Sequence, residues 1–157
     1  MGRGAGNPLL RARIEGSFPR LRNTGFEVKS PATVDYNCIA WAAGDDGRWW
    51  WPDPYYLYYW PPEFPRQSSL EGFIRAFQAM GYAECETADL EPGVQKIAIY
   101  VDQMGRPTHA ARQLPNGNWT SKLGPEEDIE HPTLEGLTGD LYGRAAIIMK
   151  RAGLPGS

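Results

Sequence analysis

The residues best suited to nucleophilic chemistry are a cysteine and a histidine that lie 71 positions apart. Cys38 stands where a short helix is expected to begin, and there unpaired backbone amides and the helix dipole favour a thiolate. His109 opens an expected β-strand. Its imidazole could take the thiol proton and return it to a leaving amine, while the Cys38 backbone amide donates to the developing oxyanion. This pair predicts a thiol hydrolase.

A structural role for the same residues is equally open. A cysteine in an apolar helix is most often a small buried hydrophobic residue, and a single histidine is as ambiguous. The other cysteine is Cys85, and without a secretory context we interpret both as thiols.

The segment Asn37–Ala42 (NCIAWA) resembles the helix start of papain-like hydrolases of the NlpC/P60, CHAP and lecithin-retinol-acyltransferase type. In those families the histidine begins a strand, and a polar residue on the next strand orients it. His109 followed by Trp119-Thr120-Ser121 is similar. The resemblance implies an α+β, papain-like (NlpC/P60-type) fold, in which a Cys-bearing N-terminal helix packs on an antiparallel β-sheet.

The residue that would orient the imidazole is open. The resemblance places it twelve positions after the histidine, at Ser121. A tight turn centred on Asn116-Gly117 would instead point Thr120 toward the face of His109 and Ser121 away, although one bulge reverses this parity. Asp128, beyond the strand, could fold back to the ring. We rank Ser121 and Asp128 equally and Thr120 behind them.

The second donor to the oxyanion is also undetermined. In papain-like enzymes a glutamine six residues before the cysteine supplies it, and that position is Ala32 here. The second donor is then either absent or supplied from elsewhere, with Tyr36 and Asn37 as candidates, and this departure argues against efficient peptidase activity.

An aromatic segment lies between the expected helices. Eight of the twelve residues of 49–60 are Trp or Tyr, and interleaved prolines exclude a long helix or a central strand. The rings could form a satellite core or the wall of a groove beside Cys38. For the groove, the predicted substrate-binding residues are Tyr36, Asn37, Trp41, Trp49, Trp50, Trp51 and Tyr55.

The elements that must position these residues follow α+β order. Helices are expected over 36–44, capped by Asp35 or Asn37, and from the Ser68/Glu71 capping box to Gly81. Strands are expected over 96–102, 109–114, 119–123 and 144–151, with a helical turn at 133–137. We expect an irregular N-terminal arm over 1–33 and one domain over 34–152.

Composition excludes several classes of function. The net charge of −3 argues against a nucleic-acid binder, and no apolar run approaches the roughly 20 residues of a membrane span. His109 and His131 are the two histidines and lack metal-site spacing, so we predict no metal and no cofactor. His131 is expected to cap a loop and is a secondary candidate for the site. We expect a cytoplasmic protein, or one exported without a cleavable signal peptide.

The whole chain from about Asp35 onward is also similar to an uncharacterised bacterial family of unknown function. The blocks that carry this similarity are 36–45, 49–52, 108–114, 119–124 and 128–131. It brings no activity with it.

From the residues and the papain-like resemblance we predict a thiol hydrolase that acts on an amide bond, as a peptidase, amidase or protein deamidase. Its catalytic residues would be Cys38, His109 and either Ser121 or Asp128, and its substrate a peptide or protein, with a cell-wall peptide as one form. The alternative is a non-catalytic module that binds peptide or glycan through loop 49–60. A third reading is an immunity or scaffold protein whose partner covers that loop.

Overall fold

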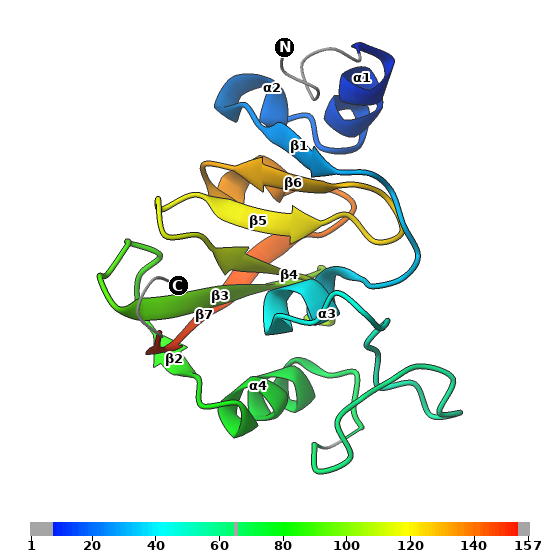
Figure 1. Cartoon of the computed structure of the whole chain (residues 1–157), viewed down its shortest axis with the longest axis vertical. Coiled ribbons are helices and arrows are strands. Elements are labelled where there is room, and N and C mark those ends of the chain that lie inside the picture. The colour runs from blue at the N-terminus through cyan, green and yellow to red at the C-terminus, as the bar shows by residue number, and fades with distance from the viewer. Residues whose placement is uncertain (1–7, 65, 154–157) are drawn as a thin grey trace.

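The computed structural model describes residues 8–64 and 66–153. It is an α+β fold built on a seven-stranded antiparallel sheet of order β1-β6-β5-β4-β3-β7-β2 (Figure 1). The strands are β1 (Glu27–Ser30), β2 (Ala83–Cys85), β3 (Val94–Val101), β4 (Pro107–Gln113), β5 (Trp119–Lys122), β6 (Asp128–His131) and β7 (Arg144–Ala152). The α+β class predicted from the sequence is confirmed.

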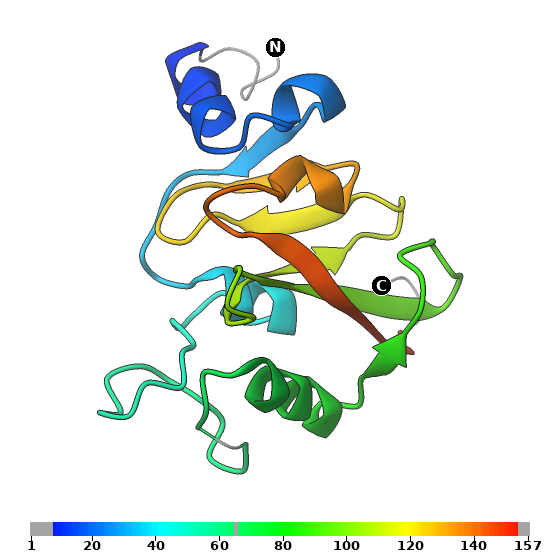
Figure 2. The same cartoon turned by 180° about the vertical axis from the view of Figure 1, so that it is seen from behind.

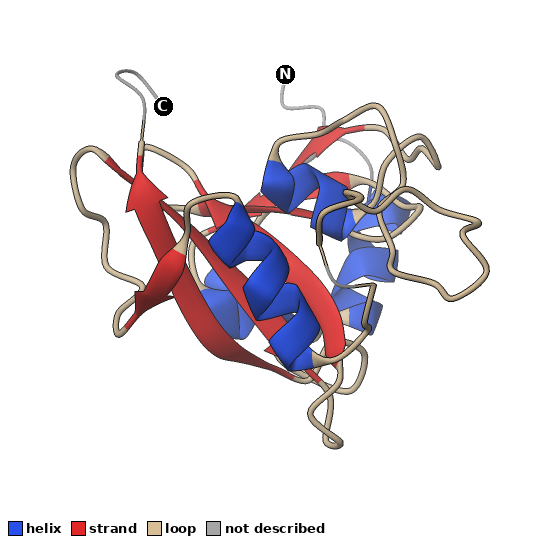
Figure 3. Cartoon of the chain, turned by 90° about the horizontal axis from the view of Figure 1, so that it is seen from below, coloured by secondary structure: helices blue, strands red, loops and turns tan. Residues whose placement is uncertain are grey.

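Helices cover both faces of the sheet. They are α1 (Pro8–Ser17), α2 (Leu21–Thr24), α3 (Cys38–Ala43), α4 (Leu70–Ala79) and the 3-10 turn η1 (Leu134–Leu137). In Figure 1, α3 lies in front of the sheet, and Figure 2 shows η1 (orange) on the opposite side. Figure 3 shows α4 lying along the sheet from below.

Two hydrophobic clusters form the core because successive strand side chains point to opposite faces. On β3, Ile97 and Ile99 belong to the cluster under α3 and α4. Ala98 and Tyr100 belong to the second cluster, which α1, α2 and η1 cover.

Local interactions explain where helix α3 begins and ends. The Asn37 side chain caps it by accepting a hydrogen bond from the Ala40 amide at 3.2 Å. Gly44 ends it in a left-handed conformation with φ of 90°, which glycine adopts without a steric penalty. Trp41 then ties the helix to the sheet, because its Nε1 donates to the Thr120 hydroxyl at 2.9 Å.

Helix α4 has the predicted apolar stripe but a different cap. Phe73 and Phe77 are buried in the first cluster. Ser69 accepts from the Gly72 amide at 3.1 Å and so occupies the cap position expected for Ser68. Glu71 therefore lies at the second helical position and pairs with Arg75 instead of closing a capping box.

The N-terminal arm is not irregular where it is described, and this corrects the prediction for residues 1–33. It forms α1, α2 and β1, and β1 pairs with β6 at one edge of the sheet. Ile14, Leu21 and Phe26 are buried in the second cluster. Residues 1–7 lie outside the described part of the chain. Glycine, proline and arginine interrupt the apolar pattern, so the sequence carried no periodic signal.

The hairpin between β4 and β5 differs by one residue from the expected tight turn. Gln113 pairs with Trp119, so the connection spans 114–118 and Gly117 takes a φ of 91°. One added residue moves every β5 side chain to the other face relative to β4. Ser121, not Thr120, therefore shares a face with His109.

Candidate functional site

A row of polar side chains crosses three neighbouring strands in the sheet. The Nε2 atom of His109 on β4 lies 3.0 Å from the Ser121 hydroxyl on β5. The same hydroxyl lies 2.8 Å from Nε2 of His131 on β6. His131 in turn uses Nδ1 to contact the Thr133 carbonyl at 2.8 Å. All three side chains are fully buried.

The strand register explains why these residues meet. Ser121 lies opposite Ile129, so His131, two positions further along β6, is its diagonal neighbour. Continued from the Arg112–Thr120 pair, the β4–β5 register sets Ala111 opposite Ser121 and makes His109 diagonal on the other side. Because Ala111 is small, the imidazole can reach across it to the hydroxyl.

Two tyrosines hold the His109 ring. Tyr142 stacks on it with ring centroids 4.1 Å apart and planes at 7°, and Tyr100 meets it edge-on at 5.3 Å. Gly143 follows with φ of 77°, and a Cβ there would overlap the Val101 carbonyl oxygen. Sequence reasoning missed Tyr142, and the adjacent glycine is the one signal that a constrained backbone positions it.

Cys38 is the first residue of α3, and it is 6% exposed. Burial raises the pKa of its thiol to about 11, although the backbone amides of Ala110 and Ile39 oppose this rise. The Lys122 ammonium also favours the thiolate. It is fully buried, donates to the Thr33 and Gly124 carbonyls, and was not predicted as part of the site.

The Cys38 thiol and the His109 imidazole lie on opposite faces of the sheet, and no hydrogen bond among the described residues joins them. Cys38 packs in the first cluster with Ala110, whereas the His109 ring contacts Tyr100 and Tyr142 on the side of the second. Burial raises the pKa of Tyr142 well above its ordinary value, and the charge of a Cys38 thiolate would raise it further. Nδ1 of His109 is buried without a hydrogen-bond partner among the described residues.

Both histidines are neutral at pH 7. Burial lowers the pKa of His109 well below its usual value, and His131 adds to this effect. Burial also lowers the pKa of His131, to about 4, although the Thr133 carbonyl and Glu130 oppose the change. At pH 7 the Cys38 thiol and both imidazoles are therefore uncharged.

Asp128 is not brought to His109. Its carboxylate accepts a hydrogen bond from the Tyr36 hydroxyl at 3.3 Å, and in the β5–β6 register Asp128 lies opposite Lys122, on the α3 face of the sheet. The ring nitrogens of His109 make no described bond to Asp128, because Nε2 meets Ser121 and Nδ1 is unpartnered. Of the two equally ranked candidates, the structure joins Ser121 to the histidine. Thr120 instead contacts Trp41.

Several predicted substrate-binding residues have structural contacts instead. Asn37 is buried, and its amide donates to the Trp50 carbonyl at 2.8 Å. Trp50 is also buried, and its Nε1 donates to Asp45 at 2.8 Å. Tyr36 is engaged with Asp128. With these partners, Asn37 and Tyr36 are not free to replace the missing oxyanion donor.

The aromatic segment 49–60 has a buried base and an exposed tip. Trp50 and Trp60 are buried, Trp49 and Trp51 are half-buried, and Trp51 packs on Phe73. At the tip, Tyr55 is 79% exposed. The segment is thus both a satellite core and a displayed aromatic surface.

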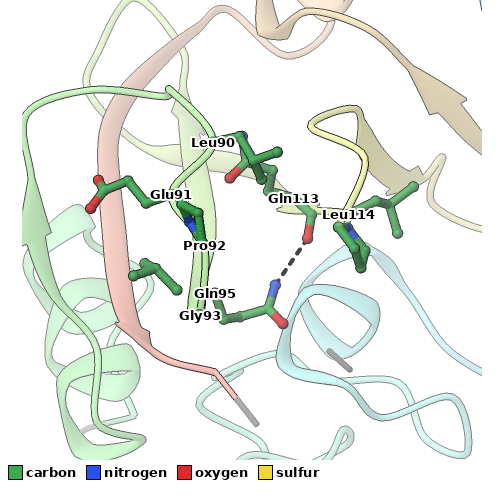
Figure 4. Close-up of a pocket in the computed structure, with 9 residues that line it drawn as sticks. Leu90, Glu91, Pro92, Gly93, Gln95, Gln113 and Leu114 are labelled. Atoms are coloured by element: carbon green, nitrogen blue, oxygen red, sulfur yellow. Dashed lines mark hydrogen bonds between the residues drawn. The ribbon is translucent and has the colours of Figure 1, made fainter. Parts of the chain in front are cut away.

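Three of the cavities among the described residues are lined by neither the cysteine nor the histidine. One of about 250 Å³ lies between the loop before β3 and the β4–β5 hairpin, where Gln95 Nε2 donates to the Gln113 carbonyl at 3.0 Å (Figure 4). A second of about 350 Å³ adjoins it near Trp119, and a third of about 320 Å³ lies beside Trp60. Neither Cys38 nor His109 lines any of the three.

Within residues 8–64 and 66–153, no group of three or more His, Cys, Asp or Glu side chains is arranged to hold a metal ion. None of the helices described here has the length and apolar character that crossing a bilayer requires.

Comparison with known proteins places the chain in one family. No curated protein and no solved structure matches it. A family model described as a domain of unknown function, DUF7689, matches residues 27–150. This match begins at Glu27, the first residue of β1, ahead of the domain start expected at residue 34. Because the model covers most of the sequence, the chain belongs to the DUF7689 family.

Proposed function

We propose that the protein is a papain-like thiol hydrolase that cleaves an amide bond, with Cys38 as nucleophile and His109 as general base and acid. The observation that carries the proposal is the unpartnered Nδ1 of His109, since its other ring nitrogen is held by Ser121. A histidine that is oriented through one nitrogen and bare at the other is equipped to accept a proton.

The reaction would run in two halves. Nδ1 of His109 takes the proton of the Cys38 thiol as the sulfur attacks the substrate carbonyl carbon. The tetrahedral intermediate collapses to a thioester, and the imidazolium gives its proton to the leaving amine. Water then attacks the thioester with His109 again as base, which releases the acid and restores the thiol. The Lys122 ammonium, whose charge already acts on Cys38, would stabilise the developing negative charge.

Substrate entry and the approach of the Cys38 thiol to the His109 ring both require movement near Tyr142. Cys38 is 6% exposed, and Tyr142 covers one face of the fully buried His109 ring. Gly139 and Gly143 bracket this segment through a pair of backbone hydrogen bonds, at 3.0 and 2.8 Å. Displacement of Tyr142 would uncover the ring without disturbing the β4–β5–β6 row.

The test uses p-nitrophenyl acetate, a small activated ester. In a Cys85→Ser background, Cys38 is the only thiol. We expect intact-protein mass spectrometry to detect an acetyl adduct that forms and is then hydrolysed. The matched Cys38→Ser, Cys85→Ser protein should form none. With the pKa raised to about 11, alkylation of Cys38 by iodoacetamide at pH 7 should be slow, so acylation is the informative reaction.

A structural role for Cys38 predicts the opposite results. The folded Cys85→Ser protein would then take up no acetyl group at Cys38. Cys38→Ala would also lose more than about 2 kcal/mol of unfolding free energy, as expected for a truncated buried side chain. These two results together would refute the hydrolase.

A second candidate is a binding module that uses the exposed tip of the aromatic segment. The Asp53 carboxylate accepts hydrogen bonds from the amides of Tyr55, Leu57 and Tyr58, which holds the tip in one conformation. Tyr55 and Tyr56 are 79% and 76% exposed, and such rings can stack on sugar faces or on proline-rich peptide. A chitohexaose or polyproline titration that quenches Trp fluorescence equally in wild type and Cys38→Ala would support it. Equal binding by Tyr55→Ala would contradict it.

A further inference from the structure

We infer that His131, acting through Ser121, fixes His109 in the tautomer that carries its proton on Nε2 and leaves Nδ1 bare. His131 is thus a positioning residue for the proposed reaction, and this inference rests on the proposed function only for its catalytic consequence. The positions of the protons follow from which atoms can donate and which can accept in the four hydrogen-bonded groups, namely the His109 ring, the Ser121 hydroxyl, the His131 ring and the Thr133 carbonyl.

At one end of this row of hydrogen bonds, the direction of donation is fixed. The Thr133 carbonyl can only accept, so Nδ1 of His131 must donate to it across 2.8 Å. In a neutral imidazole the other nitrogen is then an acceptor. Nε2 of His131 therefore receives the proton of the Ser121 hydroxyl, 2.8 Å away.

The direction of hydrogen-bond donation at His131 also determines which nitrogen of His109 carries a proton. A serine hydroxyl has a single proton, and Ser121 gives it to His131. Its oxygen can then only accept from Nε2 of His109 at 3.0 Å, which requires a proton on that nitrogen. In neutral His109 the second nitrogen, Nδ1, has no proton. It is also the atom of the row without a hydrogen-bond partner among the described residues.

The opposite direction of hydrogen-bond donation, from His131 to Ser121 to His109, requires a positively charged His131. If both of its nitrogens were protonated, Ser121 would accept from His131 and donate to His109, and the bare nitrogen of His109 would be Nε2. Burial disfavours this charged state, because the rings packed against His109 are the uncharged Tyr100 and Tyr142, although the Glu130 carboxylate opposes this effect at His131.

The tautomer decides whether His109 can act as a base. Only the form with bare Nδ1 presents a lone pair on the side of the ring that Ser121 does not occupy. General-base catalysis contributes roughly 10²- to 10⁴-fold in rate, so loss of this form is costly. A fixed tautomer also spares the site a ring rearrangement before each turnover.

The test reads the tautomers directly. The chain has two histidines, so long-range ¹H–¹⁵N correlation of the uniformly ¹⁵N-labelled full chain at pH 7 gives two ring patterns. We expect His109 to be protonated on Nε2 and His131 on Nδ1, which are opposite tautomers. A proton on Nδ1 of His109, or averaged shifts that report both tautomers, would overturn the inference.

Two variants separate positioning from packing. His131→Gln retains an acceptor for Ser121, and His131→Phe retains ring volume without one. In His131→Phe we expect mixed tautomers for His109 and an acetylation rate at least about tenfold lower. In His131→Gln we expect one tautomer and a loss of less than about threefold. Equal effects in both variants would overturn the positioning role, and the wild-type spectrum keeps the test open if His131→Phe does not fold.

The outcome is distinguishable from failure of the proposed function. Opposite tautomers with no acetyl adduct on Cys38 would leave the proton order intact and refute the hydrolase. An acetyl adduct with Nδ1 of His109 protonated would support the hydrolase and refute the proton order.

Discussion

Replacement of Ser121 by alanine tests whether the row across β4, β5 and β6 is a single network. The hydroxyl is the described partner of both His109 Nε2 and His131 Nε2, at 3.0 and 2.8 Å, and all three residues are fully buried. Each buried polar group left unsatisfied costs about 1–3 kcal/mol. We therefore expect Ser121→Ala to lose roughly 2–6 kcal/mol of unfolding free energy, measured by urea denaturation at pH 7.

The neighbouring residue supplies the control. Thr120→Val keeps the side-chain shape and removes one hydrogen bond, to Trp41 on the other face of the sheet. Because Trp41 is half-buried, water can satisfy its indole, and the expected loss is about 1 kcal/mol. If Ser121→Ala costs no more than Thr120→Val, the two histidines do not depend on this hydroxyl and the reasoning fails.

Three further predictions address neighbouring features. The pKa of His131 is about 6.5 in the unfolded chain and about 4 in the folded protein, so protonation favours unfolding and stability falls as the pH drops through this window. In urea titrations, wild type should therefore lose about 2 kcal/mol more unfolding free energy than His131→Gln between pH 7 and pH 5. Asp53→Asn should speed limited proteolysis within 53–60, since the carboxylate holds three amides there; an unchanged cleavage rate would argue against it. Gly143→Ala should cost roughly 3 kcal/mol in thermal or urea unfolding and Gly93→Ala about 1, because both glycines have positive φ but only Gly143 meets a backbone carbonyl.

The sequence predicted those elements whose signals are local. Asn37 and Gly44 mark the two ends of α3, and the apolar alternation of 97–101 marks β3. Strand β6 has no such signal, because Asp-Ile-Glu-His is mostly polar, and it becomes a strand by pairing with β5 and β1. The three-residue β2 is likewise defined by its pairing with β7. Because such pairing joins strands that are far apart in the chain, no local stretch of sequence indicates it.

The residues of the candidate site show the same difference between local signals and long-range pairing. The papain-like resemblance brought Ser121 forward as a partner of His109, and one extra residue in the hairpin decided the face on which it lies. His131 was expected to cap a loop, because without β6 nothing placed it beside Ser121. Lys122 and Tyr142 were missed for the same reason, since each joins the site through the face of the sheet on which it lies rather than through a motif.

The electrostatics of the site constrain how it could work. Burial raises the pKa of Cys38 to about 11 and lowers that of His109 well below its usual value, so both shifts oppose moving the proton from sulfur to nitrogen in this structure. A thiolate–imidazolium pair is therefore not the resting state. In the proposed reaction the proton would therefore move as the sulfur bonds to carbon, when negative charge passes to the substrate oxygen. Lys122 can then stabilise charge that the ground state lacks, and interactions that strengthen only in the transition state are those that raise the rate.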